Sequence, residues 1–181
     1  MCTDFRGNTN LPRGIRNNNP GNLRTGDSWQ GMVGADPQSF IIFANVCWGI
    51  RALAMDLTSK INRGLDTISK IFPVYAPAAD NNNVAAYINA VSNATGLGAD
   101  EQLGTDAQTL ADLVRAIADH ENGNSSMITD ADIAQGIGMM GISAGTLVQA
   151  AQVAVENTDS TTTALVVGGA IVLLFLAFRK K

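Results

Sequence analysis

The sequence predicts a mostly α-helical domain that is followed by an apolar, membrane-spanning helix. The chain has 181 residues, enough for one domain of about 150 residues and an appendage. Two observations carry the prediction. Several segments with helical apolar periodicity are joined by polar loops with few strand signals, and a long apolar run lies near the C-terminal end.

The composition excludes several classes of protein. Charged residues make up 15% of the chain and its net charge is −4, which disfavours binding to a phosphate backbone, so we expect no nucleic-acid partner. The two cysteines, Cys2 and Cys47, are too few for a multi-disulfide framework or a four-cysteine zinc site. The single histidine, His120, excludes a three-histidine zinc site. We expect neither a metal nor an organic cofactor.

Four segments of the central region are typical of helices. They span residues 45–60, 67–72, 84–95 and 107–121. Pro73 is expected to end the second helix, Gly96 the third and Gly123 the fourth. Residues 14–36 are rich in Gly, Asn and Pro and predict a loop with a short strand at most, while residues 40–43 predict a strand or a helix entry.

The C-terminal segment is the most apolar part of the chain. Residues 164–178 carry no polar side chain, threonines precede them, and Arg179, Lys180 and Lys181 follow. An eighteen-residue helix rises roughly 27 Å, close to the thickness of a hydrocarbon core. We therefore expect a transmembrane anchor at 161–181 with its basic end on the cytoplasmic side or inside a vesicle. A buried core helix is the alternative.

The other expected boundaries follow from this anchor. Residues 1–12 are a polar arm without the apolar core of a signal peptide. Residues 13–143 form the candidate domain, and residues 144–160 form a helical stalk that becomes a polar linker.

Glu121 lies where an apolar helical stripe ends. The stripe consists of Leu110, Leu113, Val114, Ile117 and Ala118. Glu121 is next in this series, so a helix that buries the stripe directs Glu121 toward the interior or a cleft. The helix dipole and partial desolvation both favour the protonated carboxyl there, as a general acid for glycoside cleavage requires. A solvated last-turn glutamate is the alternative, and His120 is expected to face solvent or a loop.

An asparagine-rich loop precedes the first predicted helix. Residues 13–24 read RGIRNNNPGNLR. Its asparagines are Asn17, Asn18, Asn19 and Asn22. Asparagine tolerates left-handed backbone, so a plain tight turn is one interpretation. The functional interpretation is a wall of amides that binds sugar hydroxyls and N-acetyl groups, with Trp29 stacking on a sugar face.

This loop, with WQG at 29–31, GIRAL at 49–53 and YAPAADNNNVAAYINAV at 75–91, resembles a family of phage virion-associated peptidoglycan-degrading proteins. The resemblance covers about residues 13–123. The segment AAYINAV is similar to the Tyr-x-x-x-Val segment of soluble lytic transglycosylases, and LVRAIADHENGN resembles their helix that ends in the catalytic glutamate.

The resemblance implies a lysozyme-like domain with Glu121 as the catalytic residue. It also implies that Tyr75 and Tyr87 bind substrate together with the asparagines and Trp29. In those enzymes the glutamate helix precedes the asparagine segment, whereas here the asparagine loop comes first. A circularly permuted lysozyme-like domain would account for this order.

The predicted reaction is cleavage of the β-1,4 bond between N-acetylmuramic acid and N-acetylglucosamine. A second carboxylate near Glu121 would allow the enzyme to act as an ordinary hydrolase. The candidates for it are Asp27, Asp36, Asp130 and Asp132. Without one nearby, the resemblance favours a lytic transglycosylase that forms a 1,6-anhydro product.

The predicted setting is a phage virion with an internal membrane, or the host inner membrane before assembly. The expected partners are peptidoglycan, a lipid membrane and other virion proteins. Two alternatives remain open. One is a non-catalytic, membrane-anchored virion protein that binds glycan or capsid, and the other is a small membrane-permeabilising lysis protein.

Overall fold

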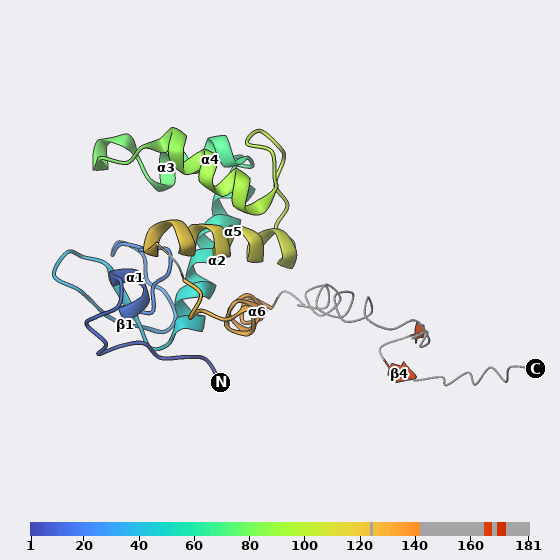
Figure 1. The fold of residues 1–181 in the computed structure, drawn as a ribbon, viewed down its shortest axis with the longest axis horizontal. Coiled ribbons are helices and arrows are strands. Elements are labelled where there is room, and N and C mark those ends of the chain that lie inside the picture. Colours follow the sequence, from blue (N-terminus) through green and yellow to red (C-terminus); the bar gives the residue numbers. More distant parts are fainter. Residues whose placement is uncertain (124, 142–164, 168–169, 173–181) are drawn as a thin grey trace, which may run out of the picture. The chain divides into compact units, whose positions relative to one another are not determined.

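The computed structural model describes residues 1–123, 125–141, 165–167 and 170–172, and it is mostly helical (Figure 1). Its helices are α1 (Arg13–Arg16), α2 (Val46–Asn62), α3 (Ile68–Tyr75), the 3-10 helix η1 (Ala78–Asp80), α4 (Val84–Thr95), α5 (Ala107–Asn122) and α6 (Asp130–Gly138). The strands β1 (Met32–Ala35) and β2 (Ile41–Phe43) pair antiparallel, and so do β3 (Leu165–Val167) and β4 (Ala170–Val172). The chain divides into two compact units, Met1–Ala144 and Gly145–Lys181.

Helix α2 forms the centre of the first unit. Asn45 caps its N-terminus by accepting a hydrogen bond from the backbone N–H of Trp48. Its buried positions include Ile50, Leu53 and Leu57, which pack the helix against α5 and α6. In Figure 1, α3 and α4 lie on one side of α2 and α5, and α1 and β1 lie on the other.

Helix α5 buries the stripe that the periodicity predicts. All five stripe residues are at most 1% exposed, and Glu121, the next residue of the series, is half-buried. Asp106 caps the helix by accepting from the N–H of Thr109, and Gly123 follows its last residue with φ of 81°. The burial of the stripe thus brings Glu121 to the boundary between core and solvent.

Two helices differ from the sequence-based expectation. Helix α3 continues through Pro73 to Tyr75, so the missing N–H of this proline costs one backbone hydrogen bond without ending the helix. Helix α6 was not expected. It begins with a capping box in which Thr129 and Asp132 each bond the other's backbone N–H, a Thr-x-x-Asp signal that the sequence does contain.

The predicted fold class is wrong in its transmembrane helix. Among the helices that the structure describes, none combines the length and apolar character needed to cross a bilayer. Within the expected anchor, 165–167 and 170–172 are paired strands, whereas the rest of 161–181 and the predicted stalk at 144–160 lie outside the described residues. Valine and isoleucine favour strands, and a Gly-Gly dipeptide separates the two strands in the sequence, a pattern typical of hairpins.

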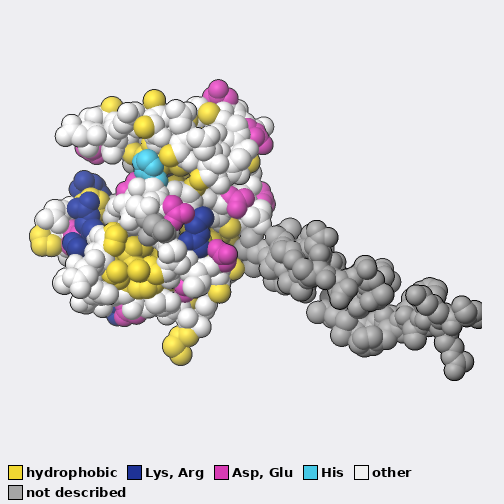
Figure 2. Space-filling model, viewed as in Figure 1, with side chains coloured by type: hydrophobic (Ala, Val, Ile, Leu, Met, Phe, Trp, Pro, Cys, Tyr) yellow, Lys and Arg dark blue, Asp and Glu magenta, His cyan; other side chains and the backbone are white. Residues whose placement is uncertain are grey.

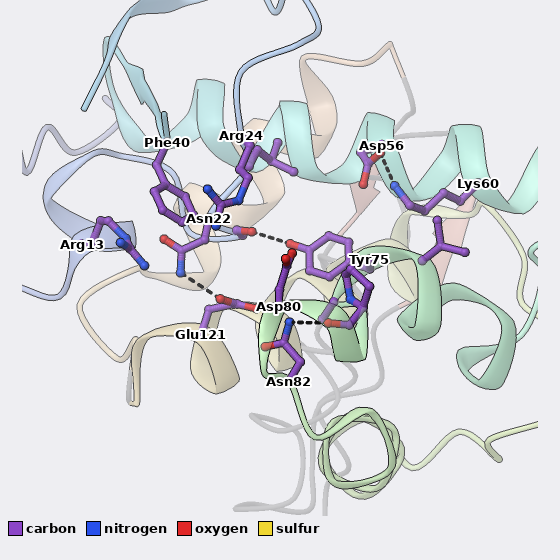
Figure 3. Close-up of a pocket in the computed structure, with 15 residues that line it drawn as sticks. Arg13, Asn22, Arg24, Phe40, Asp56, Lys60, Tyr75, Asp80, Asn82 and Glu121 are labelled. Atoms are coloured by element: carbon purple, nitrogen blue, oxygen red, sulfur yellow. Dashed lines mark hydrogen bonds and ion pairs between the residues drawn. The ribbon is translucent and has the colours of Figure 1, made fainter. Parts of the chain in front are cut away.

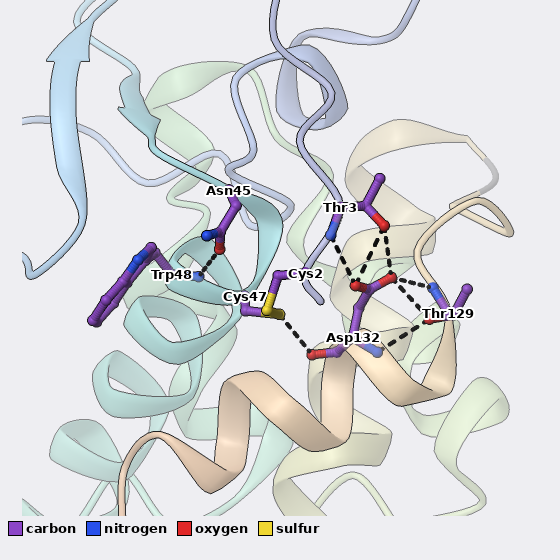
Figure 4. Close-up of a disulfide and its surroundings, with 7 residues drawn as sticks. All are labelled: Cys2, Thr3, Asn45, Cys47, Trp48, Thr129 and Asp132. Atoms are coloured by element: carbon purple, nitrogen blue, oxygen red, sulfur yellow. Dashed lines mark hydrogen bonds between the residues drawn. A yellow bond between two sulfur atoms is a disulfide. The ribbon is translucent and has the colours of Figure 1, made fainter.

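A disulfide between Cys2 and Cys47 ties the N-terminal arm to the first turn of α2 (Figure 4). The expectation that two cysteines exclude a disulfide framework overlooked this single bridge. Beside it, the N–H of Val46 donates to the carbonyl of Thr3 at 2.9 Å, and the N–H of Thr3 donates to Asp132 at 3.2 Å. The arm is therefore part of the folded unit, and it links the starts of α2 and α6.

Candidate functional site

A cavity of about 470 Å³ lies at the C-terminal end of α5 (Figure 3). It is lined by residues from the asparagine loop, α2, the segment from α3 to η1, and α5. These residues are Arg13, Gly21, Asn22, Leu23, Arg24, Phe40, Asp56, Lys60, Val74, Tyr75, Ala76, Pro77, Asp80, Asn82 and Glu121. The polar lining and the volume suit a small polar ligand such as a sugar unit.

Both carboxylate oxygens of Glu121 accept hydrogen bonds from side chains. The amide Nδ2 of Asn22 donates to Oε2 at 2.8 Å, and the hydroxyl of Tyr87 donates to Oε1 at 2.8 Å. These partners come from the asparagine loop and from α4, so three segments distant in the sequence meet at one carboxyl group. The two bonds fix the orientation of the carboxyl group at the cavity wall.

Tyr87 is held rigidly behind Glu121. Its side chain is 2% exposed, and its ring packs against Phe72 and stacks on His120 with centroid separations of 4.5 and 3.8 Å. Burial raises the pKa of Tyr87 far above its ordinary value, and the nearby Tyr75 and Glu121 act in the same direction. The phenol therefore remains a hydrogen-bond donor across the accessible pH range. His120 is exposed, as expected, and its ring covers that of Tyr87.

The neighbour of Glu121 holds the asparagine loop in place. Asn122 is buried, and its Nδ2 donates to the carbonyl of Pro20 at 2.9 Å. The next residues of the loop turn sharply, because Asn22 has φ of 49°, in the left-handed region that asparagine tolerates. Gly21 is required there, because a Cβ atom would lie 2.6 Å from the hydroxyl of Tyr75. The turn delivers the amide of Asn22 to Glu121.

The other three asparagines of the loop lie inside the protein. Asn17 donates to Asp36, Asn18 donates to the carbonyl of Phe43, and Asn19 donates to the carbonyls of Leu23 and Ile41. All three are at most 6% exposed, and none lines the cavity. The amides of Asn18 and Asn19 bond the backbone of the loop and of β2, and that of Asn17 bonds the side chain of Asp36, so they organise the turn instead of presenting donors to a ligand.

The predicted aromatic residues separate into two groups. Trp29 packs, partly buried, against a cluster of Ile41, Phe43 and Ala52, and it does not line the cavity. Tyr75 does line it, and its hydroxyl donates to the carbonyl of Gly21. Burial, together with the charges of Glu121 and Asp56, raises the pKa of Tyr75 well above its ordinary value, so this phenol also remains protonated.

None of the expected second carboxylates lines the cavity. Asp27 is exposed, Asp36 binds the asparagine loop, Asp130 pairs with Arg115, and Asp132 caps α6. Two carboxylates that the sequence analysis did not single out do line it. Asp56 is paired with Lys60, four residues later on α2, and Asp80 is exposed on η1. The i, i+4 spacing of Asp56 and Lys60 in the sequence could have predicted their ion pair, whereas no local sequence pattern marks Asp80.

No protein-family model matches the chain. Protein P5 of Pseudoalteromonas phage PM2 is 35% identical to this chain in an alignment of 125 residues, and the match covers 65% of this chain and 76% of that phage protein. Identity at this level over most of the phage protein is the mark of a shared family. The chain therefore belongs to the family of protein P5 of Pseudoalteromonas phage PM2.

Proposed function

We propose that the protein is a phage virion component that cleaves peptidoglycan glycan strands at the β-1,4 bond between N-acetylmuramic acid and N-acetylglucosamine. One observation carries the proposal. Glu121 lines a polar cavity while two side chains from distant segments hold its two oxygens. The membership of a phage protein family supports the biological setting.

In the proposed reaction Glu121 is the general acid. Its protonated carboxyl donates a proton to the glycosidic oxygen, the bond from that oxygen to the sugar C1 breaks, and an oxocarbenium-like centre forms. Tyr87 and Asn22 keep the carboxyl group oriented as the proton leaves. The Oδ1 atom of Asn22 is buried without a hydrogen-bond partner among the described residues, so it is available to accept from a sugar hydroxyl or acetamido N–H.

The second half of the proposed reaction uses the same carboxyl group. As a carboxylate, Glu121 takes the proton of the C6 hydroxyl of muramic acid while that oxygen bonds to C1, which gives a 1,6-anhydro end. Asp56 is neutralised by Lys60 and Asp80 is exposed, whereas Glu121 is the lining carboxylate that two neutral donors hold. This contrast favours a lytic transglycosylase over a two-carboxylate hydrolase.

The rival function is a non-catalytic virion protein. Such a protein has no need of an open cavity at Glu121 and could pair that residue with a cation. Instead the cavity reaches Glu121, and none of the described Lys or Arg residues forms an ion pair with it. Both features favour the enzyme.

Zymography on purified cell wall tests the proposal. The wild-type protein is expected to clear the wall. Glu121→Gln keeps the size of the side chain and an oxygen that accepts from the Tyr87 hydroxyl, but it should lose at least about a hundredfold in rate. Asp100→Asn, at an exposed position outside the cavity, is a matched charge control. Full activity of Glu121→Gln would disprove the assigned acid, and no clearing by the wild-type protein would favour the rival.

Mass spectrometry of the products separates the two reactions. Anhydro ends, with Asp80→Asn retaining activity, are the expected result for a transglycosylase. Reducing ends, lost in Asp80→Asn, would instead identify a hydrolase with Asp80 as the second carboxylate.

A further inference from the structure

The cavity carries two arginines that form no ion pair with an acidic side chain among the described residues. The described residues form ion pairs between Arg6 and Asp4, Lys60 and Asp56, Lys70 and Asp66, and Arg115 and Asp130. Arg13 and Arg24 line the cavity and belong to none of these pairs. Figure 2 shows basic side chains gathered at the edge of a notch in the domain. An anion in the cavity would therefore meet cations that the fold leaves unneutralised.

Phe40 holds both guanidinium groups. The Cζ atom of Arg13 lies 3.7 Å from the centroid of the Phe40 ring, and that of Arg24 lies 4.3 Å from it. The ring itself is 6% exposed, so it is a fixed platform, and each contact is a cation–π interaction. Two cations gathered on one ring repel each other, which a bound anion would relieve.

The donors of the two arginines are partly unused. The Nε of Arg13 is buried without a hydrogen-bond partner among the described residues. One terminal nitrogen of Arg24 donates to the carbonyl of Gln38 at 3.2 Å. Asp36 is the nearby carboxylate that feels the charge of Arg13, but its oxygens already accept from Asn17 and from the N–H groups of Gln38 and Phe40. Asp36 is thus a fixed part of the loop and leaves the guanidinium forks open.

We propose that Arg13, Phe40 and Arg24 form a carboxylate-binding subsite that recognises the stem peptide carried by muramic acid. The proposal rests on the proposed function, because the sugar bonded at Glu121 would carry that peptide. The lactyl carboxyl of muramic acid is consumed in the amide bond to that peptide, so the peptide's own carboxylates are the anions available within reach. A guanidinium fork binds a carboxylate with two parallel hydrogen bonds, which a lysine cannot reproduce.

The kinetic test compares two substrates. One is peptidoglycan with intact stem peptides, and the other is the same peptidoglycan after the free carboxylates of those peptides have been converted chemically to amides. For Arg13→Gln and Arg24→Gln we expect KM on the substrate with free peptide carboxylates to rise about tenfold, with kcat within about twofold, and KM on the amidated substrate to stay unchanged. Arg63→Gln, an exposed residue outside the cavity, is the matched charge control.

A binding test makes the proposal independent of catalysis. Glu121→Gln protein is titrated calorimetrically with a disaccharide-peptide whose carboxylates are free and with the same compound after amidation. Tighter binding of the free acid, by about tenfold, that disappears in Arg13→Gln and Arg24→Gln is the expected result. Arg13→Lys and Arg24→Lys keep the charge without the fork and should recover only part of the preference.

Other outcomes overturn one proposal without the other. Equal losses on both substrates, or no preference for the free acid, would show that the arginines shape the cavity without binding a carboxylate. If the protein binds the free acid more tightly but cleaves neither substrate, the proposed enzymatic function would be wrong and the proposed carboxylate-binding subsite would stand. A preference that survives in both arginine variants would place the carboxylate site elsewhere.

Discussion

The hydroxyl of Tyr87 donates to Oε1 of Glu121 at 2.8 Å, across a sequence separation of 34 residues. The ring behind it is packed between Phe72 and His120, so the donor has little freedom to move. A half-buried carboxyl group at the end of α5 thereby acquires one orientation. The proposed role of Glu121 as an acid depends on this contact and on its counterpart from Asn22.

Tyr87→Phe removes that hydroxyl and keeps the packed ring. Because the carboxyl group loses one of its two orienting bonds, we expect kcat on cell-wall substrate to fall about tenfold while KM changes little. The ring contacts persist, so the melting temperature should remain close to that of the wild-type protein. A parallel fall in melting temperature and activity would instead assign Tyr87 a purely structural role.

The bridge between Cys2 and Cys47 closes a loop with a sequence separation of 45 residues. Removing it restores conformational freedom to the unfolded chain, and we expect Cys2→Ser to lower the free energy of unfolding by about 2–4 kcal/mol. Cys2 does not line the cavity, so activity well below the melting temperature should be unchanged. Denaturant titrations measure the loss.

Reductant provides the control for this prediction. It should destabilise the wild-type protein to the level of Cys2→Ser and leave that variant unaffected. Equal stability of the oxidised and reduced wild-type protein would contradict the prediction.

Asp36 makes the stability of the asparagine loop dependent on pH. Burial acts to raise its pKa, but hydrogen bonds from the N–H of Phe40 and from Asn17 outweigh burial and hold the pKa below its ordinary value. The ionised form therefore stabilises the folded protein above roughly pH 4, and this contribution is lost as pH falls through the folded-state pKa. Asp36→Asn should cost about 1–2 kcal/mol at neutral pH, with a smaller difference from the wild-type protein in acid.

Unfolding measurements between neutral pH and about pH 3 check this behaviour. Asp27→Asn, at an exposed position of the same region, should not change the curve. A difference between Asp36→Asn and the wild-type protein that stays constant with pH would show that Asp36 acts through packing alone.

Local rules in the sequence were enough for α2, α4 and α5 to within about two residues, but they missed α6 and ended α3 too early. Periodicity predicted α4 with the bounds that the structure has, and it predicted the buried stripe of α5 that brings Glu121 to the cavity wall. Such patterns are local, because the helical repeat and the capping residues depend on neighbours within a few positions. The apolar C-terminal run shows the limit of this reasoning, since its composition suits a strand as well as a helix.

Only the tertiary structure decided which residues share the cavity. Asn22 reaches Glu121 across a sequence separation of 99 residues, while its neighbours Asn17, Asn18 and Asn19 turn inward to bond Asp36, the loop and β2. Residue type cannot separate these asparagines, because all four offer the same amide. The chain path through the left-handed turn at Asn22 and the anchoring of Pro20 by Asn122 determine which amide faces the cavity.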